Sequence, residues 1–218
     1  MIEQTKNLVL LALIIACQNA FAQTVESRLL KKGTRIDMVE FDANKVQNKT
    51  KVLTVESVSG KTSKVRSVTT EKGNITENNL QTYHFENGEA TWTNDAVDTK
   101  TKRPAIIIYP ATMQAGQKIN NDVTFEQTGT TPDGKKATVS VKITDRKVIG
   151  KEKVTVKGGT WDCTKLSYKF SLGLKVALIN IPFNVDAVEW YNPDVGVVKT
   201  EYSIKGAYAG HAEIASVK

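Results

Sequence analysis

The residues of this chain that could do acid–base, nucleophilic or metal chemistry are few and scattered. His84 and His211 lie far apart in the sequence, and Cys163 lies in the segment Thr160-Trp161-Asp162-Cys163, with only Lys165 as a nearby cation. No Cys, His or carboxylate cluster has the spacing of a zinc site, and no nucleophile elbow or phosphate-binding loop occurs. We therefore expect no enzyme activity, no metal and no cofactor, and we expect Cys163 to be a small buried apolar side chain.

A hydrolase is the enzymatic alternative that stays open at this point. Scattered Ser, His and Asp residues could be assembled by the fold, although nothing local in the sequence indicates it. That alternative would require a cleft holding two titratable groups whose pKa values are shifted in opposite directions.

Aromatic side chains offer more definite binding chemistry than the titratable ones. Several lie in segments with strand-like alternation, and they would line an apolar surface if a sheet curved around them. Because small barrels often hold ligands in their mouths, we hypothesise an apolar or amphipathic ligand, such as a lipid or a lipid-linked glycan. The predicted ligand-binding residues are Trp92, Trp161, Tyr168, Phe170 and Trp190. The alternative is that these rings fill the core.

A nearly continuous apolar stretch, Leu174 to Phe183, supports a second functional hypothesis. Large exposed apolar patches usually mark contact sites, so this stretch could dock on an envelope protein or on a membrane. The chain would then be a structural or protein-interaction module of the cell envelope without a small-molecule ligand. The alternative for the same residues is a central buried strand.

The N-terminal residues indicate export. Lys6 precedes the apolar run Leu8 to Ala16, which is shorter than the ~20 apolar residues that span a bilayer. It has the length of a signal-peptide core, and Ala20-Phe21-Ala22 then provides a small-residue cleavage pattern. We predict a signal peptide over residues 1–22, followed by a single β domain over 23–218 that is not transmembrane and is periplasmic or extracellular.

A lipoprotein is the alternative for the same segment. Ile14-Ile15-Ala16-Cys17 resembles a bacterial lipobox, in which Cys17 carries the lipid and anchors the chain to the outer membrane.

The formal net charge of +7 comes mainly from lysines spread along the chain without a block. Lysines at alternating strand positions usually form a solvated face or protect a sheet edge. The alternative is attraction to anionic lipid heads or polysaccharide at an envelope surface. No aromatic and basic motif of a nucleic-acid module is present, so nucleic acid is not an expected partner.

The elements that would position these residues are strands. Alternation with a period of two, broken by turn residues, continues through most of the chain after Gln23. The clearest hairpin turns at Asn87-Gly88, whose residue types suit a type I′ turn. The pattern predicts an all-β fold, an antiparallel and strongly twisted sheet that forms a half-barrel or open barrel, with a sandwich as the alternative.

Two details of this pattern bear on register. Val139 to Ile143 and Val148 to Val156 form separate strand patterns, the second bent at Gly150. Trp161 and Cys163 share one parity, whereas Leu166, Tyr168 and Phe170 share the other. This change of phase predicts a β-bulge or a sharp bend between Cys163 and Leu166.

Three segments carry a resemblance to a known family: Asp145 to Glu152, Gly159 to Leu166, and Trp190 to Glu201. They resemble the TapB-like exported bacterial proteins, and the chain is also similar to exported domains of unknown function with a YmcC-like fold. The resemblance covers roughly residues 30 to 216. It implies a twisted antiparallel sheet that curls into a half-barrel in the cell envelope, and it implies no particular activity.

Overall fold

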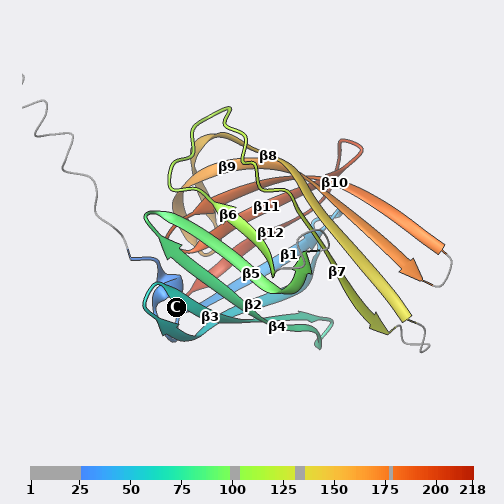
Figure 1. Cartoon of the computed structure of the whole chain (residues 1–218), viewed down its shortest axis with the longest axis horizontal. Coiled ribbons are helices and arrows are strands. Elements are labelled where there is room, and N and C mark those ends of the chain that lie inside the picture. The colour runs from blue at the N-terminus through green and yellow to red at the C-terminus, as the bar shows by residue number, and fades with distance from the viewer. Residues whose placement is uncertain (1–25, 99–103, 131–135, 177–178) are drawn as a thin grey trace, which may run out of the picture.

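The computed structural model describes residues 26–98, 104–130, 136–176 and 179–218 (Figure 1). The predicted signal peptide and Cys17 lie outside the described residues, so the predictions of cleavage and of lipidation stay predictions. Within the described residues the only helical element is a short 3₁₀ helix, η1, at Arg28–Leu30. Everything else that is regular is strand, which confirms the predicted all-β class.

In the described part of the chain, twelve strands form one antiparallel sheet. Their bounds are β1 Arg35–Asp42, β2 Gln47–Ser59, β3 Thr62–Glu71, β4 Asn74–Glu86, β5 Glu89–Asp98, β6 Pro104–Tyr109, β7 Val123–Thr130, β8 Lys136–Val156, β9 Gly159–Val176, β10 Ile179–Asn192, β11 Gly196–Ile204 and β12 Ala207–Val217. Most neighbours in space are neighbours in sequence, with the β1–β12 pairing as the main exception.

The sheet curls until its two sides nearly meet. β5 pairs with β4 at its start, with β6 at its start and near its end, and with β7 at its end, where Val97 and Asp98 lie opposite Glu126 and Phe125. These two residue pairs are the only ladder joining β5 to β7 in the described part of the chain, so a seam stays unsealed between β4 and β7. Figure 1 shows the resulting open barrel, as predicted.

Among the residues whose burial is described, two groups of buried apolar side chains form the core. One lies on the inner face of the sheet around β5 to β10 and includes Ile107, Val123, Val148 and Leu166. The other includes η1, through Leu29, and residues of β1 to β3 and β8 to β12. The Asn87-Gly88 hairpin forms as predicted, with φ of 51° and 81° at these residues.

The bulge or bend predicted between Cys163 and Leu166 does not lie in β9 itself. β9 pairs with β10 without a register shift from Thr164 to Val176. The irregularity lies in the partner strand, β8, where Val148 pairs with Leu166 but Gly150 already pairs with Lys165. The apolar phase changes along β9 because both of its faces are buried there, Cys163 in one core group and Leu166 in the other.

Among the described residues, no helix combines the length and the apolar character that a bilayer crossing requires. The side chains of residues 174–183 are not described. Whether this apolar stretch is buried or docks on a partner therefore stays an open prediction, although its backbone joins the β9–β10 ladder from residue 174 to 176 and from 179 to 183.

The tip of the β8–β9 hairpin gives a sharp test of this packing. The backbone N–H of Gly158 donates to the carbonyl of Ile214 at 2.9 Å, and a Cβ atom on Gly158 would lie 2.7 Å from Ile214 Cγ2. We expect Gly158→Ala to destabilise the fold by about 1–3 kcal/mol, because the added methyl overpacks this contact. Urea unfolding measures the change. Gly150→Ala is the control, since a Cβ there meets nothing within 4 Å, and an equal loss in both variants would contradict the packing described.

Candidate functional site

A carboxyl group lies buried on the inner face of the sheet. Alternation along β10 places Ala187, Glu189 and Tyr191 on this face, and Glu189 is only 7% exposed. The Tyr109 hydroxyl donates to Glu189 Oε1 at 2.9 Å, and the Tyr168 hydroxyl donates to Oε2 at 3.3 Å. Burial raises the pKa of Glu189, while the Arg146 charge and the two tyrosine hydrogen bonds oppose that rise.

Arg146 reaches the same region through a β-bulge in β8. Asp145 adopts a left-handed conformation with φ of 57°, and the ladder with β9 is interrupted around it. Such bulges redirect side chains, and Arg146 here is buried. Its Nη1 donates to the Ile108 carbonyl at 2.7 Å and to Asn121 Oδ1 at 3.2 Å, and its guanidinium lies 5.1 Å from the centroid of the Tyr109 ring.

Asn121 completes the edge of β6. Its Oδ1 accepts from the Ile108 N–H at 2.9 Å, and its Nδ2 donates to the Ile106 carbonyl at 3.0 Å. β6 is the last strand in the sheet order, so its outer edge needs partners other than a strand. Arg146 and Asn121 provide them, and they fix Tyr109 at the end of β6.

Two stacked tyrosines connect the buried carboxyl to a cavity. The rings of Tyr109 and Tyr191 lie 4.0 Å apart between centroids and 7° from parallel. Burial raises the pKa of both hydroxyls, so both remain neutral. Tyr109 contacts Glu189 on one side, and Tyr191 lines the cavity on the other.

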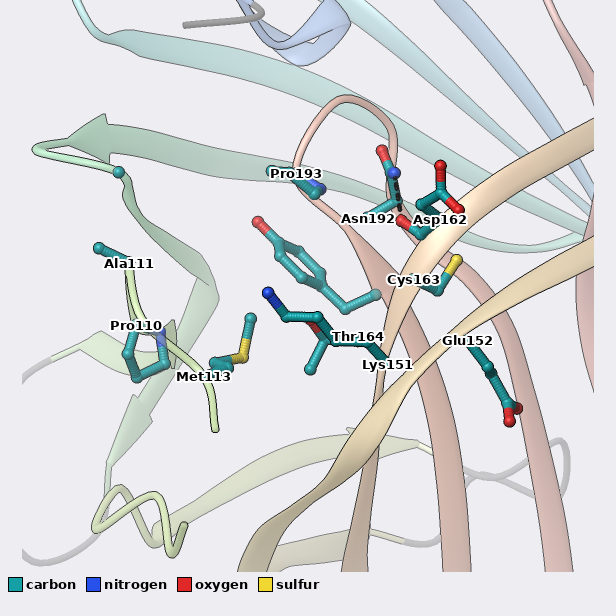
Figure 2. Close-up of a pocket in the computed structure, with 12 residues that line it drawn as sticks. Pro110, Ala111, Met113, Lys151, Glu152, Asp162, Cys163, Thr164, Asn192 and Pro193 are labelled. Atoms are coloured by element: carbon teal, nitrogen blue, oxygen red, sulfur yellow. Dashed lines mark hydrogen bonds between the residues drawn. The ribbon is translucent and has the colours of Figure 1, made fainter. Parts of the chain in front are cut away.

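The cavity has a volume of about 580 Å³ and is open on one side. It lies between the segment that follows β6 and the strands β8 and β9, close to the β10–β11 turn (Figure 2). Lys151 extends into it toward Met113, whereas Glu152 points away. Its lining residues are Gly88, Pro110, Ala111, Met113, Lys151, Glu152, Asp162, Cys163, Thr164, Tyr191, Asn192 and Pro193.

The titratable groups near the cavity do not form an acid–base pair. Burial raises the pKa of the Cys163 thiol to about 12, so it is not a thiolate. A hydrogen bond from Trp190 lowers the pKa of Glu152, which also pairs with Lys165 at 3.3 Å. Glu152 therefore shares the face of Trp190, which is opposite to the face of Glu189, and these oppositely shifted carboxyls do not meet.

The five aromatic residues predicted to bind a ligand are divided between two places. Trp92, Tyr168 and Phe170 belong to the inner face, where Trp92 and Phe170 pack on the core and Tyr168 binds Glu189. The indole N–H of Trp92 is buried without a hydrogen-bond partner. None of the five lines the cavity, and ligand binding through them stays a prediction.

Trp161 and Trp190 pack in the second core group. Trp190 lies between two cations on the neighbouring strands: Lys165 Nζ is 4.8 Å and Lys199 Nζ is 5.1 Å from its ring. These contacts are typical cation–π interactions and account for the burial of Trp190 beside charged residues.

Sequence reasoning missed Glu189, Arg146, Tyr109, Tyr191 and Lys151. One signal was available: Glu189 shares the parity of the buried Ala187 and Tyr191, and a carboxyl at an inner position is expected to need partners. His84 bonds to Thr62, His211 stacks on Phe41, and no group of three potential metal ligands occurs in the part of the chain that the structure describes.

Removing the Tyr109 hydroxyl tests the buried network. We expect Tyr109→Phe to lower the free energy of unfolding by about 1–3 kcal/mol, because Glu189 Oε1 loses its donor in a buried site. Chemical denaturation measures this loss. Tyr208→Phe removes the same atom at an exposed position and should change stability by less than about 0.5 kcal/mol. Equal effects would contradict the network.

The pH dependence of stability tests the environment of Glu189. Because burial raises its pKa above 4.5, the folded state holds the proton more tightly than the unfolded chain. The stabilisation that comes from this tighter proton binding is fully present at pH below 4.5. It is lost as the pH rises through the pKa of Glu189 in the folded state. We expect Glu189→Gln to have a higher thermal midpoint than the wild type at pH 8, with a smaller difference at pH 4. Glu126→Gln, at an exposed position, should show no such trend, and a pH-independent difference for Glu189→Gln would contradict the account.

Comparison with known proteins identifies the family and the fold. A protein described as a lipoprotein from Parabacteroides distasonis has a TM-score of 0.65 at 21% identity, over 87% of this chain and 96% of its own. A protein described as exported, with a YmcC-like fold, from Bacteroides fragilis has a TM-score of 0.66 at 18% identity, over 86% of this chain and 96% of its own. These likenesses confirm the expected fold.

Comparison with curated proteins gave no match. The family model described as DUF3108-like matches residues 91–213, more than half of the chain, and this match includes β8 to β11 and the strands that hold Tyr109 and Glu189. The chain therefore belongs to the DUF3108-like family.

Proposed function

We propose that this protein is an exported binding protein without catalytic activity, and that its ligand is a single-chain amphiphile with an anionic head. The observation that carries the proposal is the cavity of about 580 Å³, into which one lysine extends. Ligand sites are typically cavities of roughly 300–1,000 Å³ with mostly apolar walls and a few polar groups that orient the ligand.

The apolar part of the ligand would pack on the cavity wall. Met113 and Tyr191 supply the larger apolar surfaces, and Pro110 and Ala111 extend the wall on the same side as Met113. Methionine adapts to irregular apolar shapes because its side chain is unbranched and flexible. Tyr191 is held by its stack on Tyr109, so this wall is preorganised.

Lys151 would bind the head group. Its side chain is exposed, and its ammonium has no ion pair with a described residue, although Lys153, Lys165 and Lys169 each have one. A lysine ammonium is a compact cation on a long apolar stem, so it suits a phosphate or carboxylate head beside an apolar chain. Thr164 and Asn192 add polar groups near it.

Export is supported by the signal pattern at residues 1–22 and by relatives in fold that are described as exported or as lipoproteins. The location that follows is periplasmic or extracellular, and lipidation of Cys17 is the alternative to cleavage at the N-terminus. An amphiphile is a suitable ligand in either case, because such molecules are abundant in cell envelopes.

Titration with two detergents below their critical micelle concentrations tests the proposal. Isothermal calorimetry should show saturable binding of dodecyl phosphate, and dodecyl maltoside should bind less tightly because it lacks the anionic head. We expect Lys151→Gln to weaken dodecyl phosphate about fivefold, the effect of ~1 kcal/mol for one partly solvated charge pair, and to leave dodecyl maltoside unchanged.

Lys153→Gln is the matched control, since Lys153 is exposed on the same strand but does not line the cavity. Met113→Ser should weaken both detergents because it removes apolar wall. The absence of saturable binding, or equal losses in Lys151→Gln and Lys153→Gln, would overturn the proposal.

A further inference from the structure

Three hairpin tips at one end of the sheet carry exposed apolar side chains beside lysines. They are the β1–β2, β3–β4 and β11–β12 tips, and we call their side chains the tip surface: Lys45, Val46, Lys72, Ile75, Ile204, Lys205 and Tyr208. We propose that the tip surface docks on an anionic lipid bilayer, with the apolar side chains entering the interface and the lysines contacting lipid head groups.

The topology places the three tips together. The six strands concerned are consecutive in the sheet, in the order β4-β3-β2-β1-β12-β11, and each pairs antiparallel with the next. The end of β1 therefore lies beside the start of β12, where Asp42 pairs with Gly210. All three turns are thus at the same end of the molecule.

Exposure of large apolar side chains is concentrated at these tips. Ile75 is 67% and Val46 is 59% exposed, the highest values for large apolar side chains among the residues whose burial is described. Ile204 and Tyr208 are also exposed, and outside the tips only Ile106 and Ile149 are exposed to a similar degree in that part of the chain. Most other large apolar side chains whose burial is described are buried or partly buried, so the clustering needs an explanation.

The lysines occupy backbone positions that do not suit them. Lys45, Lys72 and Lys205 have φ of 60°, 49° and 51°, and a non-glycine residue with positive φ is uncommon. Lys72 and Lys205 each precede a glycine with φ near 80°, which is the type I′ geometry that favours Asn-Gly. At the other end of the sheet the same turn is made by Asn87 and Gly88.

The backbone geometry of these turns favours Asn or Gly and therefore gives no reason for a lysine at each of the three positions. A surface that binds anions gives such a reason. The carboxylates that flank the β1–β2 and β3–β4 turns already have other partners. Asp42 accepts from the N–H groups of Asn44 and Val46, and Glu71 pairs with Lys49 at 3.8 Å. None of the three tip lysines has an ion pair with a described residue. Each lysine within reach of an anionic membrane surface contributes attraction.

A bilayer suits this surface better than a protein partner does. The apolar groups stand on three separate tips with a lysine at each, instead of forming one continuous patch. Isolated apolar side chains that enter the interface, combined with lysines at the head groups, are typical of peripheral membrane binding. Tyrosine is also favoured at membrane interfaces because its ring is apolar and its hydroxyl is polar.

Docking through these tips leaves the cavity accessible. The cavity is lined by Gly88 of the β4–β5 turn and by Asn192 and Pro193 of the β10–β11 turn, which lie at the opposite end of the strands. η1 is also at that end, where Arg28 pairs with Asp194. Tip docking therefore does not use the residues that would bind the proposed ligand.

Vesicle sedimentation of a chain that begins at Gln23 tests the proposal. The twelve strands of the described residues lie between Arg35 and Val217, so this chain retains all of them and lacks the apolar N-terminal run. We expect binding to vesicles of phosphatidylglycerol and phosphatidylcholine but not of phosphatidylcholine alone. Each single change, Lys45→Asn, Lys72→Asn or Lys205→Asn, should weaken binding about fivefold. Combined replacement of Val46, Ile75, Ile204 and Tyr208 by Ser should abolish it.

Matched control variants distinguish docking through the tips from the effects of net charge and of exposed apolar side chains elsewhere on the protein. Lys32, Lys61 and Lys157 are exposed at the opposite end, and each single replacement by Asn removes the same charge as one tip change. Ile106→Ser with Ile149→Ser removes exposed apolar side chains elsewhere. No vesicle binding, or equal weakening by the tip and control variants at unchanged thermal midpoints, would overturn the proposal. Dodecyl phosphate titration of the tip variants should be unchanged, so this proposal and the cavity proposal fail separately.

Discussion

The structure depends on how the Glu189 carboxyl is satisfied inside a curled sheet. A carboxyl among apolar side chains is unfavourable unless hydrogen bonds compensate for the lost water. Tyr109 and Tyr168 provide these bonds from two other strands, and Arg146 adds a charge nearby. These groups come from β6, β8, β9 and β10, so the network links distant parts of the sheet across its inside.

The same network determines where the cavity wall lies. Tyr109 is the last residue of β6, and the cavity-lining segment from Pro110 to Met113 follows it directly. With its hydroxyl on Glu189 and its ring on Tyr191, Tyr109 has little freedom, and the wall segment begins from a fixed point. The Arg146 bulge and Asn121 hold the preceding residues of β6. Buried polar contacts thereby preorganise an apolar surface.

More of the fold than of the candidate site could be predicted from the sequence. Alternation after Gln23 and the Asn87-Gly88 turn depend on local sequence, and both predictions are confirmed by the strands and by the type I′ hairpin. β8 was expected as two strands, but it is one strand of 21 residues, because the bulge around Asp145 changes the parity without ending the ladder. The site escaped prediction because it joins residues far apart in sequence: Tyr109 and Glu189 are separated by 80 positions. Of the predicted aromatic residues only Tyr168 joins the carboxyl network.

The two ends of the sheet differ in chemistry. One end holds the cavity, with Lys151 and the stacked tyrosines, and the other presents the tip surface. The net charge of +7 is consistent with anionic partners at both ends. A protein with this arrangement could rest on an anionic surface and accept an amphiphile from the opposite side, and each step would use its own lysines.

A crystal structure of the chain grown with dodecyl phosphate tests the central claim most directly. The account predicts the phosphate beside Lys151 Nζ and the alkyl chain along Met113 and Tyr191, with Tyr109 still bound to Glu189. A cavity that remains empty at saturating detergent, or a detergent molecule that lies on the inner face among Trp92 and Phe170 instead, would contradict it.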